Sequence, residues 1–251
     1  MLNFEGKRVL VTGGARGIGA AAVAAFLGQG ARVAVGARSA ASFESFAARF
    51  DARQIAPAIG DLRDRAGAHR VIVAAVERLG GLDVLVNSAG VFAEIAIADV
   101  SQEHWDETLG INLSGTFFCA QAALPALEAA GGNIVNVASD AGLIGYPNGS
   151  AYSAAKGGVV NLTRAMAVEL ACRVRVNCVC PGNVETDMIL NAAAASGDAQ
   201  SYLERARSRA PWKRMAQPAD VAGAILYLAS DEARSTTGAA LVVDGGGTAG
   251  F

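Results

Sequence analysis

Histidine is scarce in this sequence, and its scarcity narrows the possible chemistry. The chain has two histidines, His69 and His104, among 251 residues, and neither lies in a cluster of potential metal ligands. A metal site is therefore not expected, because zinc sites draw on grouped His, Cys and carboxylate side chains. A Ser-His-Asp hydrolase is also disfavoured, since no histidine lies near the candidate serine, Ser139.

Cysteines are few, and their spacing contains no Cys-x-x-Cys motif. Cys178 and Cys180 alternate within a predicted strand, so both point to the same face of a sheet. We expect all the cysteines to be reduced core residues of a cytoplasmic protein. They are Cys119, Cys172, Cys178 and Cys180.

The sequence also lacks long apolar runs and regions of one dominant charge. No run reaches the roughly 18–20 apolar residues that span a membrane, and the first residues lack the basic and apolar blocks of a secretory signal. The net charge is −2 with no basic stripe, which argues against nucleic acid as a partner. With 52% hydrophobic and 18% charged residues, the chain has the composition of a compact protein with a large core.

What the sequence does have, at its start, is a regular alternation of predicted strands and helices. Residues 8–12 form a short β-branched apolar run, typical of a buried parallel strand. A glycine-rich loop, an alanine-rich helix and a second strand follow at residues 13–19, 20–29 and 31–36. Strand, glycine loop, helix and strand together are the dinucleotide-binding unit.

The glycines of this loop suit a bound pyrophosphate. Gly13 permits a tight turn, while Gly17 and Gly19 let the backbone approach the phosphates and let the helix pack on the sheet. The free amides and positive dipole end of the helix N-terminus favour the same anion. The first forty residues therefore predict a nucleotide site.

A second set of residues suggests proton transfer. Tyr152 and Lys156 are four residues apart, so on one helix their side chains share a face. A tyrosine has a pKa of about 10, and we expect the nearby cation to lower it so that Tyr152 exchanges a proton with a substrate oxygen. Ser139 follows the predicted strand at residues 133–138 and is placed to hydrogen-bond that oxygen.

The spacing Thr-Gly-x-x-x-Gly-x-Gly with Tyr-x-x-x-Lys resembles the short-chain dehydrogenase/reductase family, including its 3-oxoacyl reductase-like members, over essentially the whole chain. Further matching landmarks are Asp61-Leu62, Asn87-Ser88-Ala89-Gly90, Asn112, Ser139 and the run from Pro181 to Thr186. One small departure is Ser88, where the family more often has a second asparagine.

The fold implied is α/β, a doubly wound parallel sheet (Rossmann fold) with three layers. Strands and helices alternate without a linker-like break, which predicts a single domain over residues 1–251. Pro57 in the strand at residues 54–59 suits an edge strand, which is where the third strand of the 3-2-1-4-5-6 order lies. Further predicted elements are helices at 40–50, 64–79, 105–129, 152–171 and 218–230, strands at 82–86, 173–180 and 239–243, and a less regular insertion at 185–212.

The resemblance also assigns roles. Asn112, Ser139, Tyr152 and Lys156 are the implied catalytic residues, with Asn112 holding a water that relays protons from Lys156 to bulk solvent. The implied cofactor-binding residues are Gly13, Arg16, Gly17, Ile18, Gly19, Arg38, Ser39, Asp61, Leu62, Asn87, Ala89, Gly90, Tyr152, Lys156, Pro181, Gly182, Val184 and Thr186. The family tends to use the helix at 152–171 and the preceding long helix in subunit contacts, so we expect a homo-oligomer, a tetramer or dimer.

The choice of cofactor depends on charge at the end of the second strand. NAD-specific sites usually have an acid there, but this sequence has Ala37, followed by Arg38 and Ser39. Arg38 can pair with a 2′-phosphate, and Arg16 is a second cation within reach. We therefore predict NADP(H), with NAD as the alternative, because the missing acid alone does not exclude NAD.

The predicted activity is reversible hydride transfer between the nicotinamide and a ketone or secondary alcohol. The alternatives are an NAD-dependent secondary alcohol dehydrogenase and a non-catalytic nucleotide-sensing scaffold. We expect Leu143, Tyr146, Asn183 and residues 185–212 to wall the substrate pocket, with residues 185–212 as a mobile lid. The arginines at 205, 207 and 209 are interpreted as a solvated helix face, and substrate identity stays open among 3-oxoacyl thioesters, sugars, steroids and simple ketones.

Overall fold

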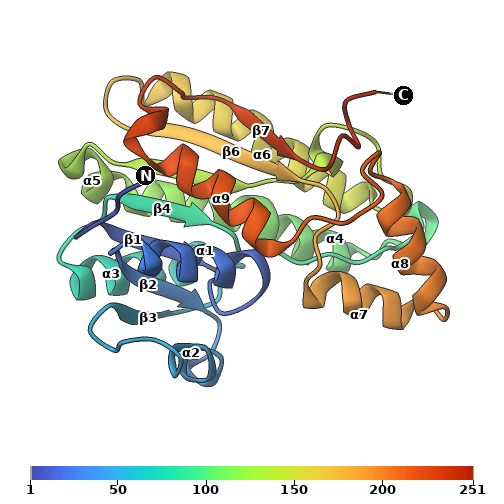
Figure 1. Cartoon of the computed structure of the whole chain (residues 1–251), viewed down its shortest axis with the longest axis horizontal. Coiled ribbons are helices and arrows are strands. Elements are labelled where there is room, and N and C mark those ends of the chain that lie inside the picture. Colours follow the sequence, from blue (N-terminus) through green and yellow to red (C-terminus); the bar gives the residue numbers. More distant parts are fainter. Residues whose placement is uncertain (1, 251) are drawn as a thin grey trace.

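The computed structural model describes residues 2–250, whose centre is a seven-stranded parallel sheet (Figure 1). The strands are β1 (Arg8–Thr12), β2 (Arg32–Ala37), β3 (Ile55–Ile59), β4 (Val84–Asn87), β5 (Asn133–Val137), β6 (Arg175–Pro181) and β7 (Ala240–Val243). Their order in the sheet is β3-β2-β1-β4-β5-β6-β7. The predicted doubly wound sheet is confirmed, with β7 added beyond β6.

Helices cover both faces of this sheet. They are α1 (Gly17–Gly28), α2 (Ala40–Ala47), α3 (Arg65–Leu79), α4 (Gln102–Leu109), α5 (Gly115–Ala130), α6 (Ser150–Glu169), α7 (Asp187–Ala195), α8 (Ala199–Ser208) and α9 (Pro218–Ala229). Short turns of other helix types are η1 (Ile97–Asp99), η2 (Gly110–Ser114), η3 (Asp140–Gly142) and η4 (Asp231–Ala233). Among residues 2–250, no helix is both long and apolar enough to cross a membrane.

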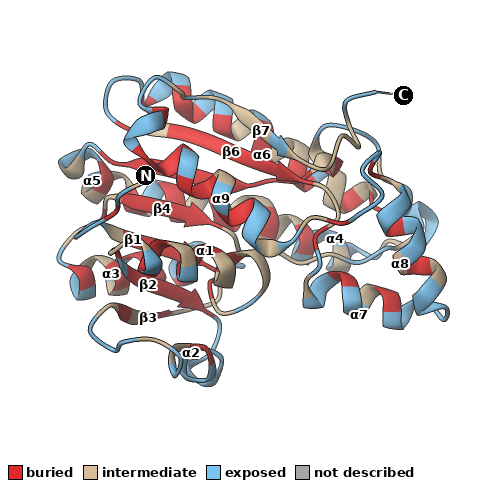
Figure 2. Ribbon diagram, viewed as in Figure 1, coloured by how far each residue is buried: buried red, intermediate tan, exposed pale blue. Residues whose placement is uncertain are grey.

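The core forms two layers because side chains alternate along each strand. Val9 and Val11 of β1 pack with residues of α1, α2 and α9, whereas Leu10 packs with α3, α5 and α6 on the other face. All three side chains are fully buried, and β1, β2, β4, β5 and β6 are buried nearly throughout, whereas the edge strands β3 and β7 are less buried (Figure 2). An apolar run without polar alternation is the sequence signature of a strand covered on both faces.

The edge strand β3 has the predicted place and composition. It pairs only with β2, and Pro57 lies opposite Val35 in that ladder. Proline has no N–H to donate, so it is tolerated where one side of the strand has no partner strand. The short strand and its proline agree with the prediction from the sequence.

The long helix predicted at 105–129 is present, but its middle is a π-helical turn that the sequence did not predict. The structure has α4, then the π-helical turn η2, then α5. The interruption contains Asn112, whose Nδ2 donates to the carbonyl oxygens of Val91 (3.0 Å) and Thr108 (2.9 Å). At this wider turn the Asn112 side chain bonds to Val91, in the loop after β4. Such π-bulges are frequent at functional sites.

The segment at 185–212 is more regular than predicted. It forms α7 and α8, which pack on one another around Ile189, Ala193, Tyr202 and Ala206. The Tyr202 hydroxyl also donates to Glu94 Oε1 at 2.8 Å, which joins the helix pair to the loop after β4. The insertion therefore has a small hydrophobic core of its own. Figure 1 shows α7 and α8 beside the sheet.

The prediction that every cysteine lies in the core was wrong for Cys172. Cys119, Cys178 and Cys180 are fully buried, with Cys178 and Cys180 in one hydrophobic cluster as their alternation predicts. Cys172 is exposed in the turn between α6 and β6, where its φ is 65°. Connecting turns usually lie at the surface because their backbone polar groups need water.

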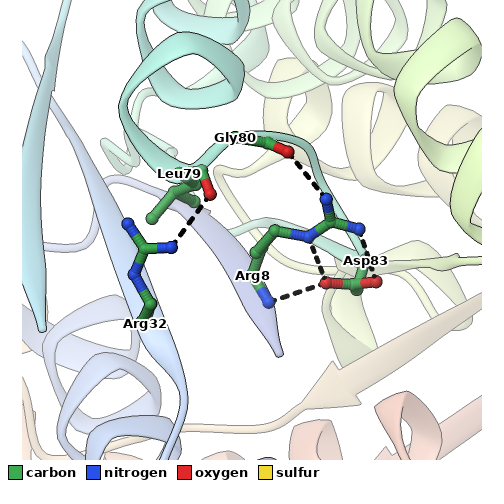
Figure 3. A network of polar contacts seen from close by, with 5 residues as sticks. All are labelled: Arg8, Arg32, Leu79, Gly80 and Asp83. Atoms are coloured by element: carbon green, nitrogen blue, oxygen red, sulfur yellow. Dashed lines mark hydrogen bonds and ion pairs between the residues drawn. The ribbon is translucent and has the colours of Figure 1, made fainter. Parts of the chain in front are cut away.

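Arginine side chains tie together the amino-terminal end of the sheet (Figure 3). Arg8 Nε and Nη2 donate to the two carboxylate oxygens of Asp83 at 2.7 and 3.0 Å, and its Nη1 donates to the Gly80 carbonyl at 2.8 Å. Arg32 Nη1 donates to the Leu79 carbonyl at 3.1 Å. The end of α3 and the turn into β4 are thereby fixed against β1 and β2.

Candidate active site

The loop after β1 and the loop after β4 are in close contact at the carboxyl end of the sheet. Gly13 has a φ of 63°, and a Cβ added there would lie 2.8 Å from the Ala89 Cα. The Thr12 hydroxyl accepts hydrogen bonds from the amides of Ser88 (3.1 Å) and Ala89 (3.2 Å). A side chain at position 13 would separate the loops, so the glycine is required by both backbone conformation and space.

The rest of the glycine loop forms a shallow cradle. Gly17 has a φ of 54°, and a Cβ there would lie 3.4 Å from Thr186 Cγ2, which reaches over from the segment after β6. A Cβ at Gly19 would collide with the Gly13 carbonyl oxygen. At the start of α1, the N-cap residue Arg16 gives no side-chain hydrogen bond and the first turn has no acidic residue. These bare amides and the helix dipole fit a pyrophosphate, as predicted.

The loops after β2 and β3 lie side by side at the far end of this cradle. Gly60 N donates to the Ala37 carbonyl at 3.0 Å, and Ala37 pairs with Ile59. The hydrogen bond from Arg63 holds the pKa of Asp61 below its usual range, and the charge of Arg38 acts in the same direction. Thus the structure brings Arg38 close to Asp61, two residues predicted to contact the adenosine.

Other residues predicted at this end have partners within the protein. Ser39 caps α2, its hydroxyl accepting from Ser42 N at 3.3 Å, and Asp64 rather than Asp61 caps α3. Asp61 forms an ion pair with Arg63 at 2.6 Å. Contacts of Arg16, Ile18, Ser39 and Leu62 with a nucleotide stay predictions.

Asn87 is engaged inside the sheet. Its Nδ2 donates to Asn136 Oδ1 at 3.0 Å, and Asn136 Nδ2 donates in turn to the Thr163 hydroxyl at 2.9 Å. These buried contacts connect β4, β5 and α6, and they leave Asn87 Oδ1 without a hydrogen-bond partner among the described residues. The side chain therefore joins the sheet to α6, and contacts of Asn87, Ala89 and Gly90 with a nucleotide stay predictions.

Lys156 and Tyr152 lie one turn apart on α6, as predicted. The Lys156 ammonium is 5.6 Å from the centre of the Tyr152 ring and donates to the Val137 carbonyl at 2.8 Å. Lys156 is buried, and burial lowers its pKa to about 8, although the nearby thiols of Cys180 and Cys178 act in the opposite direction. A lysine with this pKa exchanges protons readily near neutral pH.

The expected lowering of the Tyr152 pKa is not found. Burial raises the pKa of this phenol above its usual value, the Ser139 hydroxyl opposes the rise, and the charge of Asp140 adds to it. The edge of the Phe92 ring lies against Tyr152, with 4.9 Å between ring centres. Lys156 is not among the groups that change the pKa of this phenol, and burial favours its neutral form.

Ser139 occupies the predicted position at the end of β5, where it caps the short turn η3. Its hydroxyl accepts from Ala141 N at 3.2 Å and donates to Asp140 Oδ1 at 2.9 Å. Asp140 was not among the residues predicted from the sequence. A carboxylate directly after the candidate serine at a strand end was the available signal.

Asn112 fixes the loop after β4 beside Lys156. Its Oδ1 accepts from Val91 N at 3.3 Å, and a Cβ at Gly90 would lie 2.8 Å from that oxygen and 3.7 Å from Lys156 Nζ. Asn112, Gly90 and Lys156 are therefore neighbours. The structure brings together the predicted catalytic side chains Ser139, Tyr152 and Lys156, with Asn112 behind the lysine.

A small cavity of about 20 Å³ lies beside Asp140, the residue that follows Ser139. It is lined by Asp140, Ile144, Asn183, Arg209 and Asp244, among others. Asn183 and part of the 185–212 segment line this cavity, and that they wall a substrate pocket with Leu143 stays a prediction. Tyr146 lies next to this cavity, because Arg209, a lining residue, stacks on its ring at 4.1 Å. Within residues 2–250, no three His, Cys, Asp or Glu side chains group as a metal site.

Comparisons with known proteins agree with this architecture. A family model described as enoyl-(acyl carrier protein) reductase matches residues 13–248. D-threitol dehydrogenase of Mycolicibacterium smegmatis is 41% identical over 98% of this chain and 94% of its own, and the trans-4-hydroxycyclohexanecarboxylate dehydrogenase of Sinomonas cyclohexanicum is 39% identical over 97% and 93%. The 3-oxoacyl-[acyl-carrier-protein] reductase of Thermotoga maritima is 36% identical over 98% and 99%.

A solved structure gives the same result. The crystal structure of a short-chain dehydrogenase/reductase, titled glucose/ribitol dehydrogenase, from Brucella melitensis superposes with a TM-score of 0.91 at 34% identity, covering 98% of both chains. The chain belongs to the short-chain dehydrogenase/reductase family and is an oxidoreductase acting on CH–OH and C=O groups with a nicotinamide cofactor.

Proposed function

We propose that the protein is an NADP(H)-dependent oxidoreductase that interconverts a ketone and a secondary alcohol. The observation that carries this proposal is the meeting of Ser139, Tyr152 and Lys156 at the carboxyl end of the sheet, beside the glycine cradle. Open α/β sheets bind ligands at this edge. When bound, the nicotinamide supplies or accepts the hydride.

The protein residues manage the proton and the orientation of the substrate oxygen. Tyr152 donates a proton to the carbonyl oxygen during reduction, and its raised pKa keeps it protonated at neutral pH. Lys156, whose pKa is about 8, returns a proton to the site, and Asn112 positions the relay beside it. Ser139 holds the substrate oxygen next to Tyr152.

The surroundings of the adenosine end support NADP(H) over NAD. Ala37 at the end of β2 carries no charge to repel a 2′-phosphate, and Arg38 and Arg16 are both exposed cations. The nearby carboxylate of Asp61 is held by Arg63 at 2.6 Å, which reduces its repulsion of a phosphate. Arg38 is then the residue that binds the 2′-phosphate.

Titration of the protein with NADPH and NADH, followed by nicotinamide fluorescence, tests the cofactor. We expect NADPH to bind more tightly, and Arg38→Ala to weaken NADPH binding by at least tenfold with little effect on NADH, since hydrogen bonds to charged groups contribute about 1.5–3 kcal/mol. Arg234→Ala, which removes an exposed arginine beyond α9, is the matched control and should leave both affinities unchanged. Preferential NADH binding that is indifferent to Arg38 would reject NADP(H).

The second candidate function is an NAD-dependent secondary alcohol dehydrogenase. It is favoured by the names of relatives, which include D-threitol dehydrogenase and meso-2,3-butanediol dehydrogenase, because these names describe alcohol oxidation. Another relative is named for reduction of a 3-oxoacyl group. Steady-state turnover of a ketone with NADPH against a secondary alcohol with NAD distinguishes the two, and no turnover with intact nucleotide binding would indicate a scaffold.

We also propose a homo-oligomer, a dimer or tetramer, and a substrate lid formed by α7 and α8. Phe117 on α5 and Val168 on α6 are 39% and 80% exposed, and apolar side chains on these two helices suit a contact between subunits. Sedimentation velocity of the purified protein tests the assembly, which a monomeric mass would exclude.

A further inference from the structure

The hydrogen bonding of Ser139 conflicts with its proposed role in reduction. A serine hydroxyl has one hydrogen and two lone pairs. In this structure the hydrogen is donated to Asp140 Oδ1 at 2.9 Å, and one lone pair accepts from Ala141 N at 3.2 Å. Only a lone pair is left for the substrate, yet a carbonyl oxygen needs a donor.

Asp140 is held so that it stays close to this hydroxyl. Its Oδ1 also accepts from Ala141 N at 2.7 Å, so the same oxygen receives hydrogen bonds from Ser139 and from the backbone. Its Oδ2 lies near Gly182, where a Cβ would come within 3.5 Å. The two hydrogen bonds received by Oδ1 hold the carboxyl group beside the serine, and the Ser139 hydrogen responds to whether Asp140 is ionised.

We propose that Asp140 is a positioning residue that sets the direction of the Ser139 hydroxyl. When Asp140 is protonated, its O–H competes for the serine oxygen and the Ser139 hydrogen is free to be donated to a carbonyl oxygen. When Asp140 is ionised, Ser139 donates to it and offers a lone pair to the O–H of a bound alcohol. This inference rests on the proposed ketone–alcohol interconversion.

Several charged and titratable groups face Asp140 from the elements around it. The guanidinium of Arg209, after α8, favours the ionised carboxylate, whereas Asp244, after β7, disfavours it. Arg214 lines the same cavity. Tyr146, Tyr152 and Cys180 are the other titratable groups that respond to the Asp140 charge. Burial is the largest influence and raises the pKa of Asp140 above the usual range of an aspartate.

Ionisation of Asp140 should change kcat/KM for reduction and for oxidation in opposite directions. Reduction needs the protonated form, so kcat/KM for a ketone should fall as pH rises through the Asp140 pKa, and kcat/KM for the alcohol should rise over the same interval. The change in each is expected to be about five- to tenfold, because one net hydrogen bond contributes about 1 kcal/mol. We call the falling part of the ketone profile and the rising part of the alcohol profile the two limbs. Both limbs lie at higher pH than the titration of an ordinary aspartate would give.

The first test is the pH profile of Asp140→Asn in both directions. The amide cannot ionise, so both limbs should disappear. Asp244→Asn and Arg209→Gln, which keep Asp140, should instead shift the limbs to lower and higher pH respectively, because they remove a repelling and an attracting charge. Opposite shifts in two variants that retain the carboxyl are not expected from a structural defect.

The second test needs neither cofactor nor substrate. Because the Asp140 charge raises the pKa of Tyr152, Asp140→Asn should move phenolate formation by Tyr152 to lower pH. Ultraviolet difference titration measures this, with Tyr152→Phe subtracted to isolate the one phenol. Thermal unfolding of each variant confirms that it is folded at the pH values compared.

The outcomes separate this inference from the function on which it rests. If Ser139→Ala lowers turnover but Asp140→Asn keeps both limbs and the Tyr152 titration, the positioning role is overturned and the proposed function stands. If the wild-type protein turns over neither ketone nor alcohol with any nicotinamide nucleotide, both are overturned. Loss of the limbs with opposite shifts in Asp244→Asn and Arg209→Gln supports Asp140.

Discussion

The amino end of the sheet is fixed by arginine side chains, whereas the carboxyl end is built from glycines and a buried ionisable group. At the amino end, Arg8 bonds to Asp83 through both carboxylate oxygens, and Arg175 donates to carbonyls at the end of α9 and beyond it. At the carboxyl end, Gly13 has a positive φ and Lys156 is buried with no carboxylate partner in the described chain. Stability and chemistry are thus located at opposite ends of the same strands.

The difference has a physical cause. The carboxyl ends of parallel strands lead into helix N-termini, whose free amides attract anions, so ligands bind there. The amino ends receive helix C-termini, whose free carbonyls attract cationic side chains. Arg32 donating to Leu79 and Arg8 donating to Gly80 at the end of α3 are examples (Figure 3).

The largest expected effect separates the two ends most clearly. Tyr152→Phe should lower kcat by at least about 100-fold, because general acid catalysis contributes 10²–10⁴-fold. The phenyl ring keeps its packing against Phe92, so the unfolding temperature and the nucleotide affinity should stay close to wild type. Steady-state kinetics, calorimetry and fluorescence titration measure the three. A variant with near-normal rates would remove Tyr152 from the mechanism.

At the opposite end, Arg8→Met should destabilise the fold and leave kcat unchanged. The side chains of Arg8 and Asp83 are 29% and 16% exposed, so removing the cation leaves a largely buried carboxylate unpaired. We expect a loss of about 2 kcal/mol in the free energy of unfolding, which urea titration measures. A change in kcat at a temperature where the variant is folded would contradict the separation of the two ends.

The ion pair of Arg8 and Asp83 should also make the stability of the fold depend on pH. Burial by itself raises the pKa of Asp83, but the hydrogen bonds and charge of Arg8 outweigh it, and the net pKa is lowered. A lowered pKa means that the pair stabilises the fold above the pKa of an unfolded aspartate and that this contribution is lost as pH falls through the folded value. Urea midpoints of wild type should fall in acid, and Arg8→Met should weaken this dependence, while the lowered pKa of Asp61 preserves part of it.

The smallest effect is expected for an ion pair away from both ends. Arg53 and Asp51 form a bond of 2.7 Å in the loop before β3, but the Arg53 side chain is 89% exposed. Exposed pairs contribute little because solvent and salt screen them. Asp51→Asn should leave the unfolding temperature unchanged within error, and a shift as large as that of Arg8→Met would show that burial is not what distinguishes the pairs.

Much of the fold and the site was predictable because its signals are local in sequence. The glycine loop lies between a strand and a helix within forty residues, and Tyr152 and Lys156 share one helix face whatever surrounds them. Pro57 indicated an edge strand because proline cannot donate to a second ladder. These predictions need only the geometry of single elements.

The rest depends on contacts between distant segments. The π-helical turn around Asn112 exists because its amide bonds to Val91, a residue that no periodicity in the helix indicates. The raised pKa of Tyr152 depends on its burial and on the charge of Asp140, which follows a different strand. Cysteine is usually a core residue, so residue type alone predicts burial of Cys172. The structure shows it exposed, in a turn where its φ is 65°.

The strand order has a consequence for how the chain assembles during synthesis. In the order β3-β2-β1-β4-β5-β6-β7, each strand joins a strand already made at a free edge, first on the β2 side and then on the β4 side. No later strand is inserted between two earlier neighbours. The nucleotide cradle after β1 is therefore bounded by β4 before β6 and β7 have left the ribosome, and no pairing formed early has to be broken to admit what comes later.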